Sequence, residues 1–210
     1  MTSTAGLDRL LDAINFAVCK HQNQVRKDQR GSPYITHPIS VAQAIYAIGS
    51  VEETHILIAA VLHDTIEDTD TSEAEIQEQF GENILAIILE VSDDKSLEKM
   101  ERKRRQVVHA GELSYAAKLI KLADKLVNCR DILLSPPKDW PLARRQAYIQ
   151  WAADVVYEIR GTNPSLENAF DKMLLEAQKK LKFDIMPYKT VNERPWAPYE
   201  ITHQPGENDE

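Results

Sequence analysis

The sequence predicts an all-α fold, a single bundle of helices with an extended C-terminal tail, and three observations support this. The chain has 210 residues, enough for one domain of ordinary size with its own core. Its composition, with 43% hydrophobic and 28% charged residues, is that of a globular protein rather than a disordered one. Nearly every segment has apolar residues at helical spacing, and none alternates for long as a β-strand would.

The expected helices are separated by residues that begin or end helices. The first, over residues 7–23, is amphipathic and is followed by a polar, basic loop. Pro38 suits the first turn of the next helix, where the missing N–H is not needed. Thr71 or Ser72 can cap a later helix, and Gly81 ends it. We expect helices at about 7–23, 38–48, 52–66, 72–80, 82–92, 97–109, 114–134, 141–160 and 164–181.

Residues 182–210 differ in composition from the rest of the chain. They contain several prolines and aromatic residues and end in an acidic stretch. We therefore expect two parts, a helical domain over 1–181 and an extended tail over 182–210 that packs on the domain surface. The alternative is that the tail is a short linear binding segment.

Charge and cysteine content restrict the expected partners. The net charge of −8 argues against a nucleic-acid partner, but a metal ion and a few cations can still create a site for a small anion. No apolar run approaches the ~18 residues of a membrane span, and no signal peptide is apparent, so no membrane partner is expected. Cys19 and Cys129 lie among apolar neighbours, which predicts buried free thiols and a cytoplasmic location. The oligomeric state stays open.

The strongest chemical signal is the segment AAVLHDTIEDTD, residues 59–70. His63 and Asp64 end an apolar run. Glu67 and Asp68 each follow one of them by four residues, which on a helix places all of these side chains on one side. Ionisable groups pushed against a core are costly without a compensating charge, which a divalent cation supplies. The alternative, a solvated acidic helix end, explains the two later acids but not the histidine–aspartate pair.

Two further residues complete a candidate metal site. His37 lies in YITHPISVA, where a lone histidine is more often a packing or capping group. Asp124 lies in AKLIKLADKLVNCRD at the rim of an apolar arc, where it needs a partner; a salt bridge is the alternative. Two imidazoles and two carboxylates suit a six-coordinate transition ion, with Mn²⁺ favoured and Fe²⁺, Co²⁺ or Zn²⁺ left open. The candidate ligands are His37, His63, Asp64 and Asp124.

Several other ionisable residues are expected to face solvent. A helical projection of 114–134 places Lys118, Lys121 and Lys125 opposite the apolar arc. A second basic group could face phosphates, although a solvated helix is the expectation for most of it: Lys95, Lys99, Arg102 and Lys103. The histidines outside the candidate site are expected to be bystanders: His21, His55, His109 and His203.

The pattern H…HD…D, with HDTIED at its centre, resembles the HD superfamily. The segments RKD…GSPYITHPISVA, AAVLHDTIEDTD, FGENI, EVSDDKSLEKMERKR and KLIKLADKLVNCRD resemble the hydrolase domain of the Rel/Spo enzymes. They are more similar still to its free-standing animal relative, the metazoan SpoT homologue of the Mesh-type small alarmone hydrolases. The resemblance covers about residues 8–181 and implies an HD-domain helical bundle; it does not extend to the tail.

The resemblance implies metal-dependent hydrolysis of guanosine 3′,5′-bis(diphosphate), here ppGpp, to GDP and pyrophosphate. It implies that the four candidates are the metal ligands, and that Glu67 and Asp68 are catalytic acids that act on the attacking water. Without the resemblance, the residues that it places at the substrate would be interpreted as solvated charges or packing aromatics. These substrate-binding candidates are Arg26, Lys27, Asn128, Trp140, Arg144 and Tyr148.

Three alternatives to a ppGpp hydrolase stay open. A similar pocket could accept NADPH and remove its 2′-phosphate. An HD-type 5′-nucleotidase is another, but Arg26 and Lys27 ahead of the first histidine favour an extra diphosphate. A third is a catalytically silent alarmone sensor, against which the intact Glu67 and Asp68 pair argues. The tail is too short for a nucleotide synthetase domain, so we expect hydrolysis only.

Overall fold

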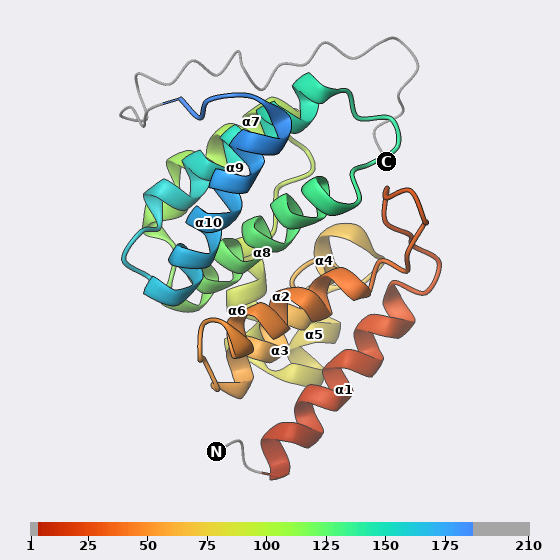
Figure 1. Cartoon of the computed structure of the whole chain (residues 1–210). Helices are drawn as coiled ribbons and strands as arrows, with labels where there is room; N and C mark the ends of the chain where they lie inside the picture. Colours follow the sequence, from red (N-terminus) through yellow and green to blue (C-terminus); the bar gives the residue numbers. More distant parts are fainter. Residues whose placement is uncertain (1–3, 187–210) are drawn as a thin grey trace.

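Helix α8 (Tyr115–Leu134) runs through the middle of the computed structural model, which describes residues 4–186 (Figure 1). Most of the helix is buried between Ala117 and Leu133, because neighbours cover it on several sides. A helix covered in this way has little solvent-facing surface, so even its charged residues need partners inside the protein. The covering helices are α2 (Thr36–Ala47), α6 (Glu82–Val91), α9 (Leu142–Glu158) and α10 (Pro164–Leu181).

Helix α3 (Thr54–Leu62) forms a second centre of packing. Its residues from Ile56 to Leu62 are all buried, and it contacts α2, α6 and α1 (Thr4–Lys20). The remaining helices lie outside these: α4 (Thr65–Asp68), α5 (Glu73–Phe80), α7 (Lys99–Val108) and the 3₁₀ turn η1 (Ala110–Glu112). Within residues 4–186 the only β-structure is one isolated bridge, between Val25 and Pro33, so the predicted all-α fold is confirmed.

Capping residues begin several helices as the sequence predicts. The Ser72 hydroxyl accepts a hydrogen bond from the N–H of Glu75 (3.2 Å) at the start of α5. Gly81 ends that helix with a φ of 92°, a conformation that a residue with a Cβ rarely adopts. Asn163 caps α10 in the same way, followed by Pro164 in the first turn.

The expected continuous helix over 52–66 is wrong, because it breaks into α3 and α4. Asp64, with φ −98° and ψ −4°, departs from helical geometry between the two. The buried Thr65 hydroxyl donates to the Leu62 carbonyl oxygen (2.7 Å), a side-chain bond of the kind that competes with the helical ladder. The break turns the chain directly after His63, and α4 then runs for a single turn.

Three other expectations concern the cysteines, the tail and the membrane. Cys129 is buried as expected, but the expectation for Cys19 is wrong, because it lies on the exposed side of α1. Most of the tail, residues 187–210, lies outside the described residues, so the division into 1–181 and 182–210 stays a prediction. No helix within 4–186 has the length and apolar character needed to cross a membrane.

Gly49 provides a test of how tightly α2 is held against α10. A Cβ at this position would lie 2.6 Å from the Ile45 carbonyl oxygen and 3.0 Å from Leu166 Cδ1. We expect Gly49→Ala to reduce the free energy of unfolding by about 1–3 kcal/mol, because backbone must move. Urea unfolding measures this, with Gly111→Ala as control, since the nearest atom there is 3.5 Å away. Equal stability of the two variants would contradict the prediction.

Candidate functional site

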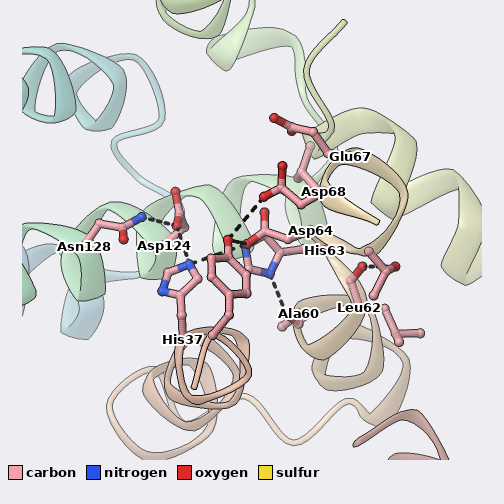
Figure 2. Close-up of polar contacts among 12 residues, drawn as sticks. His37, Ala60, Leu62, His63, Asp64, Glu67, Asp68, Asp124 and Asn128 are labelled. Atoms are coloured by element: carbon pink, nitrogen blue, oxygen red, sulfur yellow. Dashed lines mark hydrogen bonds and ion pairs between the residues drawn. The ribbon is translucent and has the colours of Figure 1, made fainter. Parts of the chain in front are cut away.

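The four candidate metal ligands converge from α2, from the turn between α3 and α4, and from α8 (Figure 2). His37 Nε2 lies 3.1 Å from Asp124 Oδ1 and 3.8 Å from Asp64 Oδ2. His63 Nε2 lies 3.1 Å from the same Asp64 oxygen. Donor atoms of His37, His63 and Asp124 all lie within 4.8 Å of one another, which is a spacing that one ion can bridge.

The orientation of His63 is fixed by its second ring nitrogen. Nδ1 lies 2.7 Å from the Ala60 carbonyl oxygen, and because a carbonyl only accepts, Nδ1 must carry the hydrogen. In the neutral ring, Nε2 therefore presents a lone pair to the Asp64 carboxylate. Two acceptors at this distance repel each other unless a proton or a cation lies between them.

The electrostatics of the cluster favour positive charge. Burial opposes protonation of His63, but the charges of Asp64 and Asp124 outweigh it and raise the pKa of His63 from 6.5 to about 9. Burial likewise opposes ionisation of Asp64, yet the neighbouring imidazoles hold the pKa of its carboxyl well below its usual range. Two carboxylates and two imidazoles are a donor set that suits a divalent ion, so the residues present fit the metal that the HD pattern implies.

Asp124 is held by residues of its own helix. Lys125 Nζ lies 2.9 Å from Asp124 Oδ2, and Asn128 Nδ2 donates to Oδ1 at 2.6 Å. Burial would raise the pKa of the Asp124 carboxyl, but Lys125 and His37 lower it well below its usual value. The carboxylate is therefore charged and oriented, as a metal ligand must be.

Glu67 and Asp68 lie on α4, one turn beyond the ligands (Figure 2). Glu67 Oε2 accepts a hydrogen bond from the Asp93 N–H (2.9 Å), and burial raises the pKa of its carboxyl. Asp68 Oδ1 pairs with Lys95 Nζ at 2.6 Å. The loop between α6 and α7, residues 92–98, thus contacts both acids from outside the ligand cluster.

Two adjoining cavities open onto this cluster. A small one of about 140 Å³ is lined by the four ligands and by Glu67. A larger one of about 410 Å³ lies beside it, and both are lined by His37 and three further residues, Arg26, Tyr34 and Asn128. A volume above about 300 Å³ is in the range of small-molecule sites. A cavity of small-molecule size therefore lies beside the cluster of candidate metal ligands.

The structure brings most of the substrate-binding candidates to the larger cavity: Arg26, Lys27, Asn128, Trp140 and Tyr148 line it. Arg26 also donates to Asn128 Oδ1 (3.1 Å), so it is linked through Asn128 to Asp124. Arg144 does not line either cavity; its guanidinium carbon lies 4.6 Å from the centre of the Trp140 ring. Its expected place beside the ligand is thus indirect, through the aromatic ring.

Lysines expected on a solvated face instead lie inside the protein. Lys125 is buried, and its Nζ lies 4.2 Å from the centre of the Trp151 ring. Lys121 Nζ donates to the Val91 carbonyl oxygen (2.6 Å) and lines the small cavity. The helical projection was wrong here because α8 is covered on several sides. Lys103 also departs from the expectation, since burial lowers its pKa from 10.5 to about 8.

Tyr34 contacts a candidate ligand but is not among the residues that the sequence predicts for the site. The Tyr34 hydroxyl donates to Asp64 Oδ2 at 2.6 Å. The position of Tyr34 within YITHP, three residues before His37, is a signal that could have indicated a role at the site. His21 is 2% exposed, its ring lies 4.9 Å from that of Tyr34, and it lines neither cavity, so the expectation that it is a bystander stays a prediction.

Comparison with known proteins finds relatives that agree with one another in family. A family model described as an HD domain matches residues 13–152. The guanosine-3′,5′-bis(diphosphate) 3′-pyrophosphohydrolase MESH1 of Xenopus tropicalis is 49% identical over 176 residues, which cover 84% of this chain and 97% of that protein. The Homo sapiens protein of the same name is 48% identical over 161 residues, 77% of this chain and 90% of its own. A solved structure described as a metazoan ortholog of SpoT that hydrolyses ppGpp has 42% identity and a TM-score of 0.78, covering 80% of this chain and 94% of its own.

Replacing Asp124 tests the ligand cluster. We expect Asp124→Asn to weaken Mn²⁺ binding by at least about 100-fold, because the ligand charge is lost while the shape is kept. Calorimetric titration with Mn²⁺ measures the affinity. The control is Asp171→Asn, which removes a carboxylate that pairs with Arg160 on the protein surface. An unchanged affinity in the Asp124 variant would remove this residue from the metal site.

Proposed function

This chain belongs to the HD-domain family, on its animal Rel/Spo-like branch, and from this membership and the site geometry we propose that it is a ppGpp hydrolase. The reaction removes the 3′-pyrophosphate and leaves GDP and pyrophosphate. The observation that carries this proposal is the junction of the two cavities at the cluster of His37, His63, Asp64 and Asp124. A nucleotide in the larger cavity can place one phosphorus atom at that cluster.

The lining of the larger cavity matches the parts of a nucleotide. Trp140 and Tyr148 offer aromatic faces on which a base can stack. Arg26 and Lys27 offer cations for phosphate oxygens, and an arginine can hold two of these oxygens at once. These residues and Asn128 are the proposed substrate contacts, and Arg144 supports them by packing on Trp140.

We propose Mn²⁺ as the ion held by the four ligands, because it accepts both carboxylate oxygens and imidazole nitrogens. When bound, such an ion supplies Lewis-acid polarisation of a phosphoryl oxygen and of water. The protein residues fix where that polarisation acts. Ala60 orients His63, and Lys125 and Asn128 orient Asp124, so the ligand geometry is set before substrate arrives.

Glu67 and Asp68 are the proposed catalytic acids. The water oxygen attacks the phosphorus attached to the ribose 3′ oxygen, and one carboxylate accepts the water proton. The bond between that phosphorus and the 3′ oxygen breaks, and the proton passes to the departing 3′ oxygen, which gives the hydroxyl of GDP. Burial raises the pKa of Glu67, which makes its carboxylate a stronger proton acceptor near neutral pH.

The free thiols support a proposal about the cellular compartment of the protein. We propose a cytoplasmic protein, because Cys19 and Cys129 are both free, and a reducing compartment keeps exposed thiols such as that of Cys19 reduced.

Product analysis tests the proposed function. The purified chain, loaded with Mn²⁺, is incubated separately with ppGpp, NADPH and a nucleoside 5′-monophosphate. We expect GDP and pyrophosphate in equal amounts from ppGpp, and no products after the metal is removed with a chelator. Phosphate released only from NADPH, or nucleoside released only from the monophosphate, would replace the proposal with the corresponding activity. Tight ppGpp binding without turnover would indicate a sensor.

Separate variants test the roles of the acids. We expect Glu67→Gln and Asp68→Asn to bind Mn²⁺ and ppGpp but to lose roughly 10²–10⁴ in kcat, since the amides keep the shape and cannot accept the proton. Glu78→Gln, at an exposed position of α5, is the control. Turnover at the wild-type rate in both variants would limit these acids to a supporting charge. Loss of metal would instead make one of them a ligand.

A further inference from the structure

Tyr34 contacts both a candidate ligand, Asp64, and a proposed catalytic acid, Asp68. Its hydroxyl donates to Asp64 Oδ2 at 2.6 Å and lies 3.4 Å from Asp68 Oδ2. A hydroxyl has one hydrogen, so Asp64 receives the short bond and Asp68 the longer, weaker contact. The same oxygen atom of Tyr34 therefore contacts one carboxylate from each group.

Hydrogen bonds hold the backbone of Tyr34 on both sides. Its N–H donates to the Gln24 carbonyl oxygen (2.9 Å), and its carbonyl accepts from the His37 N–H (2.9 Å), which begins α2. Its ring lies 4.9 Å from the ring of His21, which is buried. A side chain held in this way offers its hydroxyl from a constant position.

The backbone of Asp68 depends on the same segment of chain. The Gln24 side-chain amide donates to the Asp68 carbonyl oxygen, and Gln24 Oε1 lies 2.6 Å from His21 Nδ1. Residues 21–24 thus hold the main chain of Asp68 and also the residue that contacts its side chain. Asp68 and Tyr34 are therefore placed relative to each other by one short turn.

The other side-chain contact of Asp68 is less constrained. Lys95 approaches from the loop over 92–98, and its side chain is 51% exposed. Exposed ion pairs contribute little, because water screens them and a long side chain must be ordered. Tyr34 lines both cavities and faces the site, so it is the contact with a defined geometry.

We propose that Tyr34 is a positioning residue that fixes the Asp68 carboxylate relative to the metal ligand Asp64. This inference rests on the proposed function, since it concerns how one catalytic acid is placed. A partly buried tyrosine that merely satisfies its hydroxyl needs one acceptor of any kind. Here both acceptors are carboxylates of the site, and the ring is held by the turn that also holds Asp68.

A double-variant experiment tests this role. Tyr34→Phe keeps the ring and removes the hydroxyl. At Mn²⁺ and ppGpp concentrations that saturate each protein, we expect its kcat to fall about 10- to 100-fold, the range for removing a group that orients a site residue. KM is expected to stay near the wild-type value, because the hydroxyl that is removed contacts Asp64 and Asp68, while the ring that lines the cavities is kept. The control is Tyr46→Phe, at a position of α2 that is 51% exposed.

The decisive comparison uses Asp68→Asn as the background. If Tyr34 acts through Asp68, adding Tyr34→Phe to that variant should lower kcat by less than about threefold, because coupled residues are not additive. Mn²⁺ affinity, measured by calorimetry, should weaken by no more than about tenfold. An equal loss in both backgrounds, an unchanged kcat, or an abolished Mn²⁺ site would each overturn the inference. Absence of ppGpp turnover in the wild-type protein would instead contradict the proposed function.

Discussion

The structure depends on one constraint: the side chains of His37, His63, Asp64 and Asp124 face one another where α2 and α8 meet the turn that follows α3. The negative charge of the two carboxylates must be balanced there. Removing charged side chains from water costs free energy. Contacts among the four side chains offset part of this cost, and a bound cation would offset more of it. The buried faces of α3 and α8 hold His63 and Asp124 within reach of His37. The hydrophobic core therefore serves here as the frame of a charged centre.

The residues around the centre divide into two groups with different tasks. Lys125 and the Ala60 carbonyl each contact a candidate ligand and do not line the larger cavity. Asn128 and Tyr34 each contact a candidate ligand and also line the larger cavity. Through this second group, the candidate metal cluster and the larger cavity are joined by one network of hydrogen bonds.

The sequence predicted the helices and the four metal candidates because these signals are local. Periodicity identified the helices, and the pair His63–Asp64 at the end of an apolar run was unusual enough to suggest a charge partner. Contacts between distant segments were not accessible in this way. The burial of Lys125 follows from the helices packed around α8, and the link from Tyr34 to Asp68 depends on a loop and a turn that meet only in the folded chain.

The break between α3 and α4 also places the candidate ligands and the proposed acids in different surroundings. His63 and Asp64 follow directly after α3, a helix that is buried almost throughout, where few substitutions are tolerated. Glu67 and Asp68 lie on a single turn that the surface loop over 92–98 contacts, and surface loops accept sequence change readily. Substitution of Lys95 in that loop therefore removes a contact of Asp68, whereas the contacts of Asp124 with Lys125 and Asn128 lie within α8.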